Sequence, residues 1–153
     1  MSGASRVLTL GPVAGLVGTA VMTLSQRVEM RASKRSPSTV PGQVGARLLG
    51  RDDPADVERL SPIVHWTHGA TMGAARGLLG SIGLRGPAGT AAFFAVLWSG
   101  DALLYKSLGI ADWPWRWAAR DLATDVGHKA IYAAVTGLVY DKLSGEAGDQ
   151  GRS

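Results

Sequence analysis

Apolar stretches of helical length alternate with polar connections along this chain. Residues 7–26 contain no charged side chain and lie between Arg6 and Arg27. A helix needs about 20 residues to cross the hydrocarbon core of a membrane. The pattern therefore predicts a transmembrane helix over about residues 7–27.

Three later stretches have a similar length, although charged residues interrupt them. They cover about residues 62–84, 87–109 and 115–139. Ser61-Pro62 marks the start of the first of these three stretches, since proline is favoured in the first turn of a helix. The connections between these stretches are short, so neighbouring helices should be antiparallel. The sequence predicts an all-α fold, a four-helix transmembrane bundle.

The long connection between the first two predicted helices also contains helical patterns. Within residues 31–60, Gln43 begins two turns with Val44, Leu48 and Leu49 on one side. Such amphipathic pieces favour a position at the membrane surface. We expect a short interfacial helical segment in this connection.

The length of the chain, 153 residues, is typical of one domain. Asp53-Pro54 predicts a separate turn that ends near Leu60. We assign residues 1–143 to a single integral membrane domain. Residues 144–153 are small and polar, which predicts a disordered tail.

Small residues recur at every fourth position in the first two predicted helices. They are Gly11, Gly15 and Thr19 in the first, and Gly69, Gly73 and Gly77 in the second. This spacing lets helix backbones approach closely inside lipid. In water each such glycine would cost about 1 kcal/mol against alanine. The glycine faces are therefore candidates for helix packing, including association with a second copy or another membrane protein.

Composition narrows the function classes. Apolar residues make up 46% of the chain and charged residues 18%, which favours a membrane protein over an ordinary soluble enzyme. The chain has no cysteine, which excludes disulfides, thiolate metal sites and cysteine nucleophiles. The net charge is +4, but the basic residues follow the connections instead of one helix face, so no nucleic acid is expected as a partner. The expected partner is the lipid bilayer.

Basic residues favour one side of the predicted bundle. The first and third connections carry eight, namely Arg27, Arg31, Lys34, Arg35, Arg47, Arg51, Arg59 and Arg116. The opposite side carries four, namely Arg6, Arg85, Lys142 and Arg152. The positive-inside rule then places the first and third connections in the cytoplasm and both termini outside.

Tryptophans mark one membrane interface. They are Trp66, near the start of the second predicted helix, and Trp113, Trp115 and Trp117, before the fourth. Indole rings prefer the level of the lipid headgroups. We expect these four side chains to anchor the bundle at the side of the long connection.

Acids and histidines fall at similar depths in all four predicted helices. The candidates for a polar cluster are Glu29, His65, His68, Asp101, Tyr105, Asp121, Asp125 and His128. Asp121, Asp125 and His128 share one face of the last helix because of their spacing. Ionisable groups at this depth should point inward and pair with one another, since contact with lipid is costly.

Three interpretations of this cluster stay open. In the first, the pairs fix the helix register of a structural or interaction module without turnover. In the second, His65, His68, Asp125 and His128 hold a divalent metal, as carboxylates and imidazoles do in helical bundles, and the protein is a metal-binding protein or enzyme. In the third, the same groups form a proton or small-solute pathway.

Scattered motifs of this chain resemble those of a known family. They are His65-Trp66 with Gly69 and Gly73, Leu108-Gly109 before a tryptophan–proline connection, and Gly127-His128 in the last helix. In this order the chain resembles the uncharacterised YagU-like bacterial inner-membrane proteins and similar small actinobacterial membrane proteins. The resemblance implies a multi-pass protein of the bacterial inner membrane and carries no established activity.

Two other interpretations of the location also stay open. Arg6 followed by an apolar stretch up to Gly18, with small residues up to Ala20, fits a cleaved secretory signal. Charges interrupt three of the four stretches and the mean hydropathy is only slightly positive, which is compatible with a soluble helical protein.

Overall fold

The computed structural model describes the backbone of residues 3–149 and the side chains of residues 7–145. The described chain contains five α-helices, one 3-10 turn and no β-strand, which confirms the predicted all-α class. The elements are α1 (Gly3–Ser33), α2 (Val40–Leu48), α3 (Pro54–Ser81), α4 (Gly86–Ser107), η1 (Pro114–Arg116) and α5 (Ala119–Asp149).

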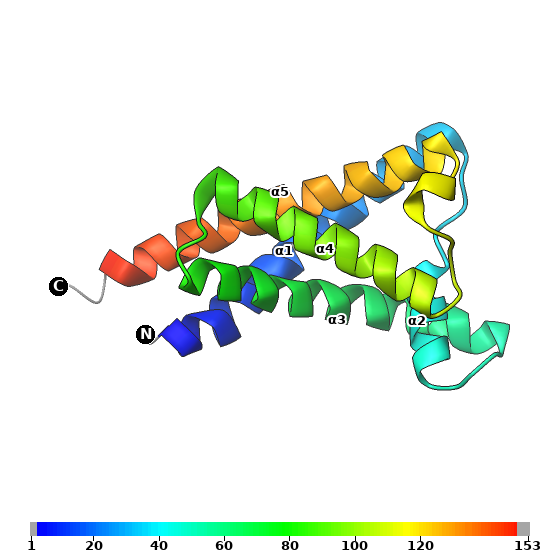
Figure 1. Ribbon diagram of the computed structural model, residues 1–153, viewed down its shortest axis with the longest axis horizontal. Coiled ribbons are helices and arrows are strands. Elements are labelled where there is room, and N and C mark those ends of the chain that lie inside the picture. Colours follow the sequence, from blue (N-terminus) through cyan, green and yellow to red (C-terminus); the bar gives the residue numbers. More distant parts are fainter. Residues whose placement is uncertain (1–2, 150–153) are drawn as a thin grey trace.

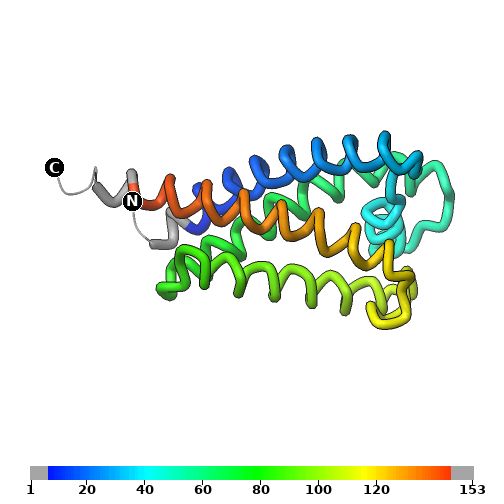
Figure 2. The backbone as a smooth tube through the Cα atoms, turned by 90° about the horizontal axis from the view of Figure 1, so that it is seen from above, coloured from blue at the N-terminus to red at the C-terminus, as the bar shows by residue number. Residues whose placement is uncertain are grey.

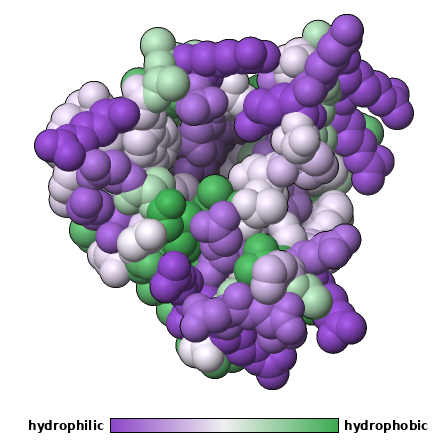
Figure 3. All heavy atoms as spheres, turned by 90° about the vertical axis from the view of Figure 1, so that its right-hand side faces the viewer, coloured by the Kyte–Doolittle hydropathy of each residue, from purple (hydrophilic) through white to green (hydrophobic). Residues whose placement is uncertain are grey.

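Four long helices, α1, α3, α4 and α5, lie alongside one another and alternate in direction (Figure 1, Figure 2). Helix α1 contacts both α3 and α5, and α4 packs mainly on α5. The connections over residues 34–53 and 108–118 lie together at one end of the molecule, which we name the loop end. The start of α1 and the end of α5 lie at the opposite end. Figure 3 views the loop end, where most residues are hydrophilic.

Helices α1 and α3 touch through their glycine faces. A Cβ atom at Gly11 would lie 2.6 Å from the carbonyl oxygen of Gly73, and one at Gly73 would lie 2.7 Å from the Cα of Gly15. A Cβ atom at Gly69 would collide with the hydroxyl of Thr19. Only hydrogen fits between backbones at this distance. The structure thus places the two glycine faces against each other within one chain.

Two further glycines bring α1 close to its neighbours. A Cβ atom at Gly77 would lie 3.1 Å from the Cα of Val7, near the start of α1. On the other side of α1, a Cβ atom at Gly18 would lie 3.1 Å from the ring of Tyr132 in α5. Small residues therefore set the spacing of α1 from both α3 and α5.

Helix α3 begins at Pro54, earlier than the start that the sequence predicts at Pro62. The carboxylate of Asp53 accepts a 2.8 Å hydrogen bond from the backbone N–H of Ala55 and so caps the helix. Pro62 lies inside the continuous helix. A proline removes one backbone hydrogen bond, and here the helix continues on both sides of it. The separate turn predicted after Asp53 is the first part of α3.

The short helix of the long connection is α2, and it packs on the first turns of α3. Val44 is buried, as its position on an apolar side predicts. Leu48 and Leu49 are not on that buried side, since they are 65% and 58% exposed. Besides Val44, the buried residues of α2 are small, namely Gly42, Gly45 and Ala46, and a Cβ atom at Gly42 would meet the backbone of Val57.

The last helix differs from the prediction at both ends. It begins at Ala119, after the turn η1, and not at residue 115. It continues to Asp149, so the helix includes much of the segment predicted as a disordered tail. Ser144 is buried at 2% exposure, which explains why the chain does not leave the helix there. Residues 150–153 lie outside the described residues.

Several polar and charged side chains are buried between the helices, while many large apolar side chains are exposed. The fully or largely buried polar side chains include Thr19, Arg76, Asp101, His128, Lys129 and Thr136. The outer faces of the long helices carry large apolar side chains, among them Leu8, Val13, Leu24, Val28, Ile63, Leu78, Val96, Leu103 and Leu138. An apolar core is present but small, and centres on Phe93, Leu97, Tyr132 and Ala133.

Candidate functional site

A partly open cavity of about 440 Å³ lies at the loop end. All four long helices line it, and α2 together with both connections forms its outer rim. Its volume falls in the range of small-molecule sites in proteins. Seven of the eight residues predicted as a polar cluster line this cavity, namely His65, His68, Asp101, Tyr105, Asp121, Asp125 and His128. Of these, Asp121 is exposed.

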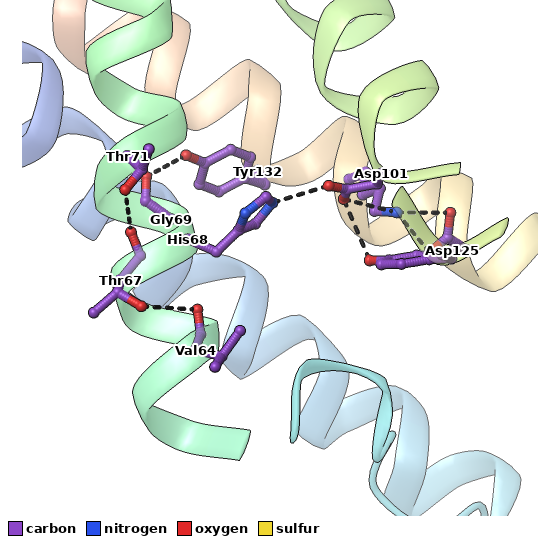
Figure 4. Close-up of polar contacts among 10 residues, drawn as sticks. Val64, Thr67, His68, Gly69, Thr71, Asp101, Asp125 and Tyr132 are labelled. Carbon is purple, nitrogen blue, oxygen red and sulfur yellow. Dashed lines mark hydrogen bonds and ion pairs between the residues drawn. The ribbon is translucent and has the colours of Figure 1, made fainter. Parts of the chain in front are cut away.

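Asp101 of α4 is the most deeply buried carboxylate of the site, at 3% exposure. His68 of α3 points to it, with Nε2 at 3.0 Å from Oδ1 (Figure 4). On α5, Lys129 Nζ lies 3.0 Å from Oδ2. The hydroxyl of Tyr105 donates a 3.4 Å hydrogen bond to the same carboxylate. One buried acid therefore connects three helices.

Asp125 is the second carboxylate of this network. Its Oδ1 lies 3.0 Å from Lys129 Nζ, one helical turn away on α5. Trp98 of α4 donates a 3.1 Å hydrogen bond from Nε1 to Oδ2 of Asp125. Lys129 thus stands between Asp101 and Asp125, and its ammonium group also lies 4.9 Å from the centre of the Tyr105 ring. Burial of this lysine is compensated by two carboxylates and an aromatic face.

A second group of contacts joins α1 to α5. Ser25 Oγ lies 3.0 Å from His128 Nδ1, and His128 Nε2 lies 3.9 Å from the Glu29 carboxylate. Arg35 donates to the same carboxylate at 3.0 Å. The sequence predicts Glu29 as a member of the polar cluster. In the structure its carboxylate lies outside the cavity lining and pairs mainly with Arg35.

The remaining histidine pairs with a hydroxyl group. His65 Nε2 lies 2.9 Å from Thr23 Oγ1 of α1. One turn further along α3, the hydroxyl of Tyr132 donates a 2.6 Å hydrogen bond to the carbonyl oxygen of Gly69 (Figure 4). These bonds hold α3 against α1 and α5 at the base of the cavity.

The predicted metal ligands His65, His68, Asp125 and His128 have separate partners. Their nearest polar atoms belong to Thr23, Asp101, Lys129 and Ser25 respectively. Among the described residues, no group of three or more histidines and acids is arranged to hold a metal ion.

Three of the four predicted tryptophan anchors, Trp113, Trp115 and Trp117, lie at the loop end, and Trp66 lies near the middle of α3. Trp66 is 40% exposed, and Trp115, in η1, is 74% exposed. The rings of Trp113 and Trp115 stack with centres 5.1 Å apart. Trp117 instead turns inward, where it lines the cavity and donates a 2.6 Å hydrogen bond to the carbonyl oxygen of Asp112.

Sequence reasoning missed the cation of the site. Lys129 follows Asp125 by four residues on α5, a spacing that brings opposite charges together on a helix. This spacing could have identified Lys129 as a partner of Asp125 from the sequence alone. Trp98 and Thr23 had no comparable signal, because both lie inside apolar stretches and their partners come from other helices.

A further buried cation lies at the opposite end of the molecule. Arg76 of α3 is fully buried and donates a 2.7 Å hydrogen bond to Asp141 of α5. The other oxygen of Asp141 accepts from the backbone N–H of Gly86 at the start of α4. The Arg76 guanidinium also lies 4.9 Å from the centre of the Tyr140 ring. This cluster fastens three helices together without lining the cavity at the loop end.

The fold and the site together describe an all-helical chain with charged networks between its helices and a cavity at one end. No family of proteins, no curated protein and no solved structure matches the chain in comparisons of sequence and structure.

Proposed function

We propose that this protein is an integral membrane protein that crosses the bilayer four times, through α1, α3, α4 and α5. The observation that carries the proposal is the exposure of large apolar side chains along the long helices, together with the burial of charged side chains between them. Val96 is 49% exposed in the middle of α4 and Leu24 is 59% exposed on α1, whereas Asp101 and Lys129 are buried. Lipid removes the cost of the apolar surface, and polar groups inside the bilayer need partners of the kind that this network supplies.

Helix length and composition support the proposal. Helix α4 has 22 residues, which at 1.5 Å per residue gives about 33 Å, close to the thickness of a hydrocarbon core. Two helical segments, Val7–Ser33 and Gly86–Ser107, are long and apolar enough to cross a membrane. Helices α3 and α5 carry charges within their length, but Arg76 and Lys129 are buried against other helices. Such charges are tolerated in a bundle because they do not face lipid.

Within this membrane protein, the network around Asp101 serves as a structural device. It joins α3, α4 and α5 through one carboxylate. Separate contacts of Thr23 with His65 and of Ser25 with His128 join α1 to α3 and α5. Polar contacts between helices fix their register where the hydrophobic effect gives no preference. Since the glycine faces of α1 and α3 cover each other, a second copy or another membrane protein would associate through the outer apolar faces.

The cavity favours a second candidate, a proton or small-solute pathway. It leads from the loop end to His68 and Asp101, and Lys129 and Tyr105 lie beside it. Intramembrane acids and histidines in contact with a cavity often carry protons or bind solutes. The divalent-metal alternative lacks this support, since the described acids and histidines do not gather around one point.

The orientation follows from charge. The loop end carries most of the arginines and lysines that lie outside the helix interior, so this end faces the cytoplasm. The resemblance to YagU-like proteins agrees with a place in a bacterial inner membrane. Both ends of the described chain would then lie on the outer side.

Fractionation tests the four-span proposal. The protein should sediment with membranes, stay there after washing at alkaline pH and enter solution only with detergent. A peripheral helical protein of the same host serves as the control for the wash. Recovery of folded protein in the soluble fraction without detergent would refute the proposal.

A further inference from the structure

We infer that the cavity at the loop end binds a small organic cation with an apolar or aromatic body. The inference deepens the proposed function, because it names a ligand class for the same polar network. It rests on the shape of the cavity, its charge and the way in which the chain already holds one cation there.

The cavity wall suits the body of such a ligand. Apolar side chains such as Met22, Val44 and Leu97 line it together with the rings of Tyr105 and Trp117. Its volume of about 440 Å³ is sufficient for a ligand of one or two rings. Aromatic faces attract cations, most strongly where water is excluded. The wall therefore favours a positively charged group on an apolar frame.

The charge of the cavity wall is negative. Three carboxylates line it, Asp101, Asp121 and Asp125, and Lys129 is the ammonium group between two of them. Arg35 also lines the cavity, and it pairs at 3.0 Å with the carboxylate of Glu29, which lies outside the lining. The three carboxylates of the lining outnumber its two cations, Lys129 and Arg35, by one. An anionic ligand would meet repulsion here, whereas a cation would reduce the imbalance.

Lys129 shows how a cation is held at this place. Its Nζ lies 3.0 Å from Asp101 and 3.0 Å from Asp125, and 4.9 Å from the centre of the Tyr105 ring. Two carboxylates and an aromatic face are also the groups that recognise a ligand ammonium. The ammonium group of Lys129 therefore already occupies a cation-binding position in the cavity. A free cation would bind beside this group or compete with it.

A buried ring nitrogen in the cavity wall points to a ligand independently of the acids. His128 is 8% exposed, lines the cavity and has Ser25 at its Nδ1. Among the described residues, its Nε2 has no hydrogen-bond partner, and the nearest carboxylate, that of Glu29, is 3.9 Å away. A buried nitrogen without a partner is costly, and a ligand N–H or a bound water could satisfy it.

Binding of benzylammonium, a cation whose ammonium group carries N–H donors, to the purified full chain in detergent tests the inference. Calorimetry should detect saturable binding of this cation, and phenylacetate, an anion of similar size, should not bind. Asp121→Asn should weaken the affinity for the cation about tenfold, because it removes one wall charge at an exposed position that folding does not need. Asp52→Asn removes an exposed acid at the same end but outside the cavity wall and should leave the affinity unchanged.

Lys129→Met provides a second test with the opposite sign. It removes the competing ammonium group and should tighten cation binding about tenfold in protein that stays folded by circular dichroism. Absence of binding in folded protein, equal binding of phenylacetate, or equal effects of the Asp121 and Asp52 variants would each overturn the inference. These failures leave the four-span proposal intact, since that proposal depends only on fractionation.

Discussion

Asp101 lies where three helices meet. Its carboxylate contacts His68 of α3 and Lys129 of α5, each at 3.0 Å, while its own backbone belongs to α4. An unpaired charge inside a bundle is far more costly than a paired one. The free energy of the network therefore depends on both signs of charge being present.

Asp101→Asn should destabilise the protein by about 3 kcal/mol, because it leaves Lys129 with one carboxylate instead of two. Thermal unfolding in detergent, followed by circular dichroism, measures the change. Asp121→Asn is the matched control, since Asp121 is exposed, and its effect should stay below about 0.5 kcal/mol. Equal stability of the two variants would contradict the structural role of Asp101.

At the scale of residues, the sequence indicates which acids and histidines lie between the helices, but it does not indicate which side chains they pair with. Asp101 and His68 stand out because each interrupts an apolar stretch. Arg76 interrupts one too, but its partner Asp141 lies 65 residues away, and no periodicity connects the two. Side-chain pairs between helices depend on rotation and register, which hydrophobic patterns define only to within about a turn.

At the scale of elements, the contact between α1 and α3 depends on the absence of side chains. Gly73→Ala should cost about 2 kcal/mol, because the new Cβ atom would lie 2.7 Å from the Cα of Gly15, in backbone that cannot move aside locally. Gly100→Ala is the control. Gly100 lies within α4, and no atom would contact a Cβ atom there. Alanine at this position should leave the free energy of unfolding unchanged or raise it by up to about 1 kcal/mol.

Thermal unfolding of both glycine variants is measured in the same detergent. The comparison shows whether glycine is required only where α1 and α3 touch or at any position of a long helix. Loss of stability in the Gly73 variant together with none in the Gly100 variant is the expected result. If both variants were as stable as the parent protein, the close approach of α1 and α3 would be wrong.

The connection between α4 and α5 depends on one carboxylate outside the helices. Asp112 accepts hydrogen bonds from Lys106 at 2.8 Å, from the backbone N–H of Trp113 at 2.9 Å and from Arg116 at 3.1 Å. These bonds, that of Lys106 foremost, lower the pKa of Asp112 to about 2. The folded pKa lies below the unfolded one, so Asp112 stabilises the fold above about pH 4 and this contribution disappears as the pH falls towards 2.

Asp112→Asn should therefore flatten the dependence of the unfolding temperature on pH between about pH 4 and pH 2. Asp52→Asn is the control, because Asp52 is an exposed acid of the other connection. The measurement is thermal unfolding of the three proteins over this pH range. Identical pH profiles for the Asp112 variant and the parent would exclude the predicted role of Asp112.

The sequence predicts elements better than their boundaries. Residues 7–26 lie inside α1, and residues 87–107 lie inside α4, because both stretches are apolar and of helical length. The start of α3 is displaced, since two Ser/Asp-Pro pairs satisfy the same capping rule and only Asp53 caps the helix. In α2, exposure of Leu48 depends on packing against α3, which the local pattern does not contain.

At the scale of the whole molecule, the central claim is that the outer apolar surface faces lipid. A bundle in water would bury side chains such as Val96 and expose groups such as Lys129, and the structure has the reverse arrangement. The four long helices alternate in direction, with the start of α1 and the end of α5 at one end of the molecule and the loop end at the other, which is the arrangement that the proposed four-span topology requires. The exposed apolar side chains are therefore the direct place to test it.

Single-cysteine labelling is the most direct test, and the natural absence of cysteine makes every introduced one unique. Val96→Cys and Leu16→Cys place a thiol at positions that are 49% and 40% exposed, and Ser36→Cys places one in the exposed long connection. Membranes open on both faces are treated with a water-soluble maleimide. The account predicts that Ser36→Cys reacts at once and that Val96→Cys and Leu16→Cys react only after the lipid is dissolved. Equally fast labelling of all three in intact membranes would contradict it.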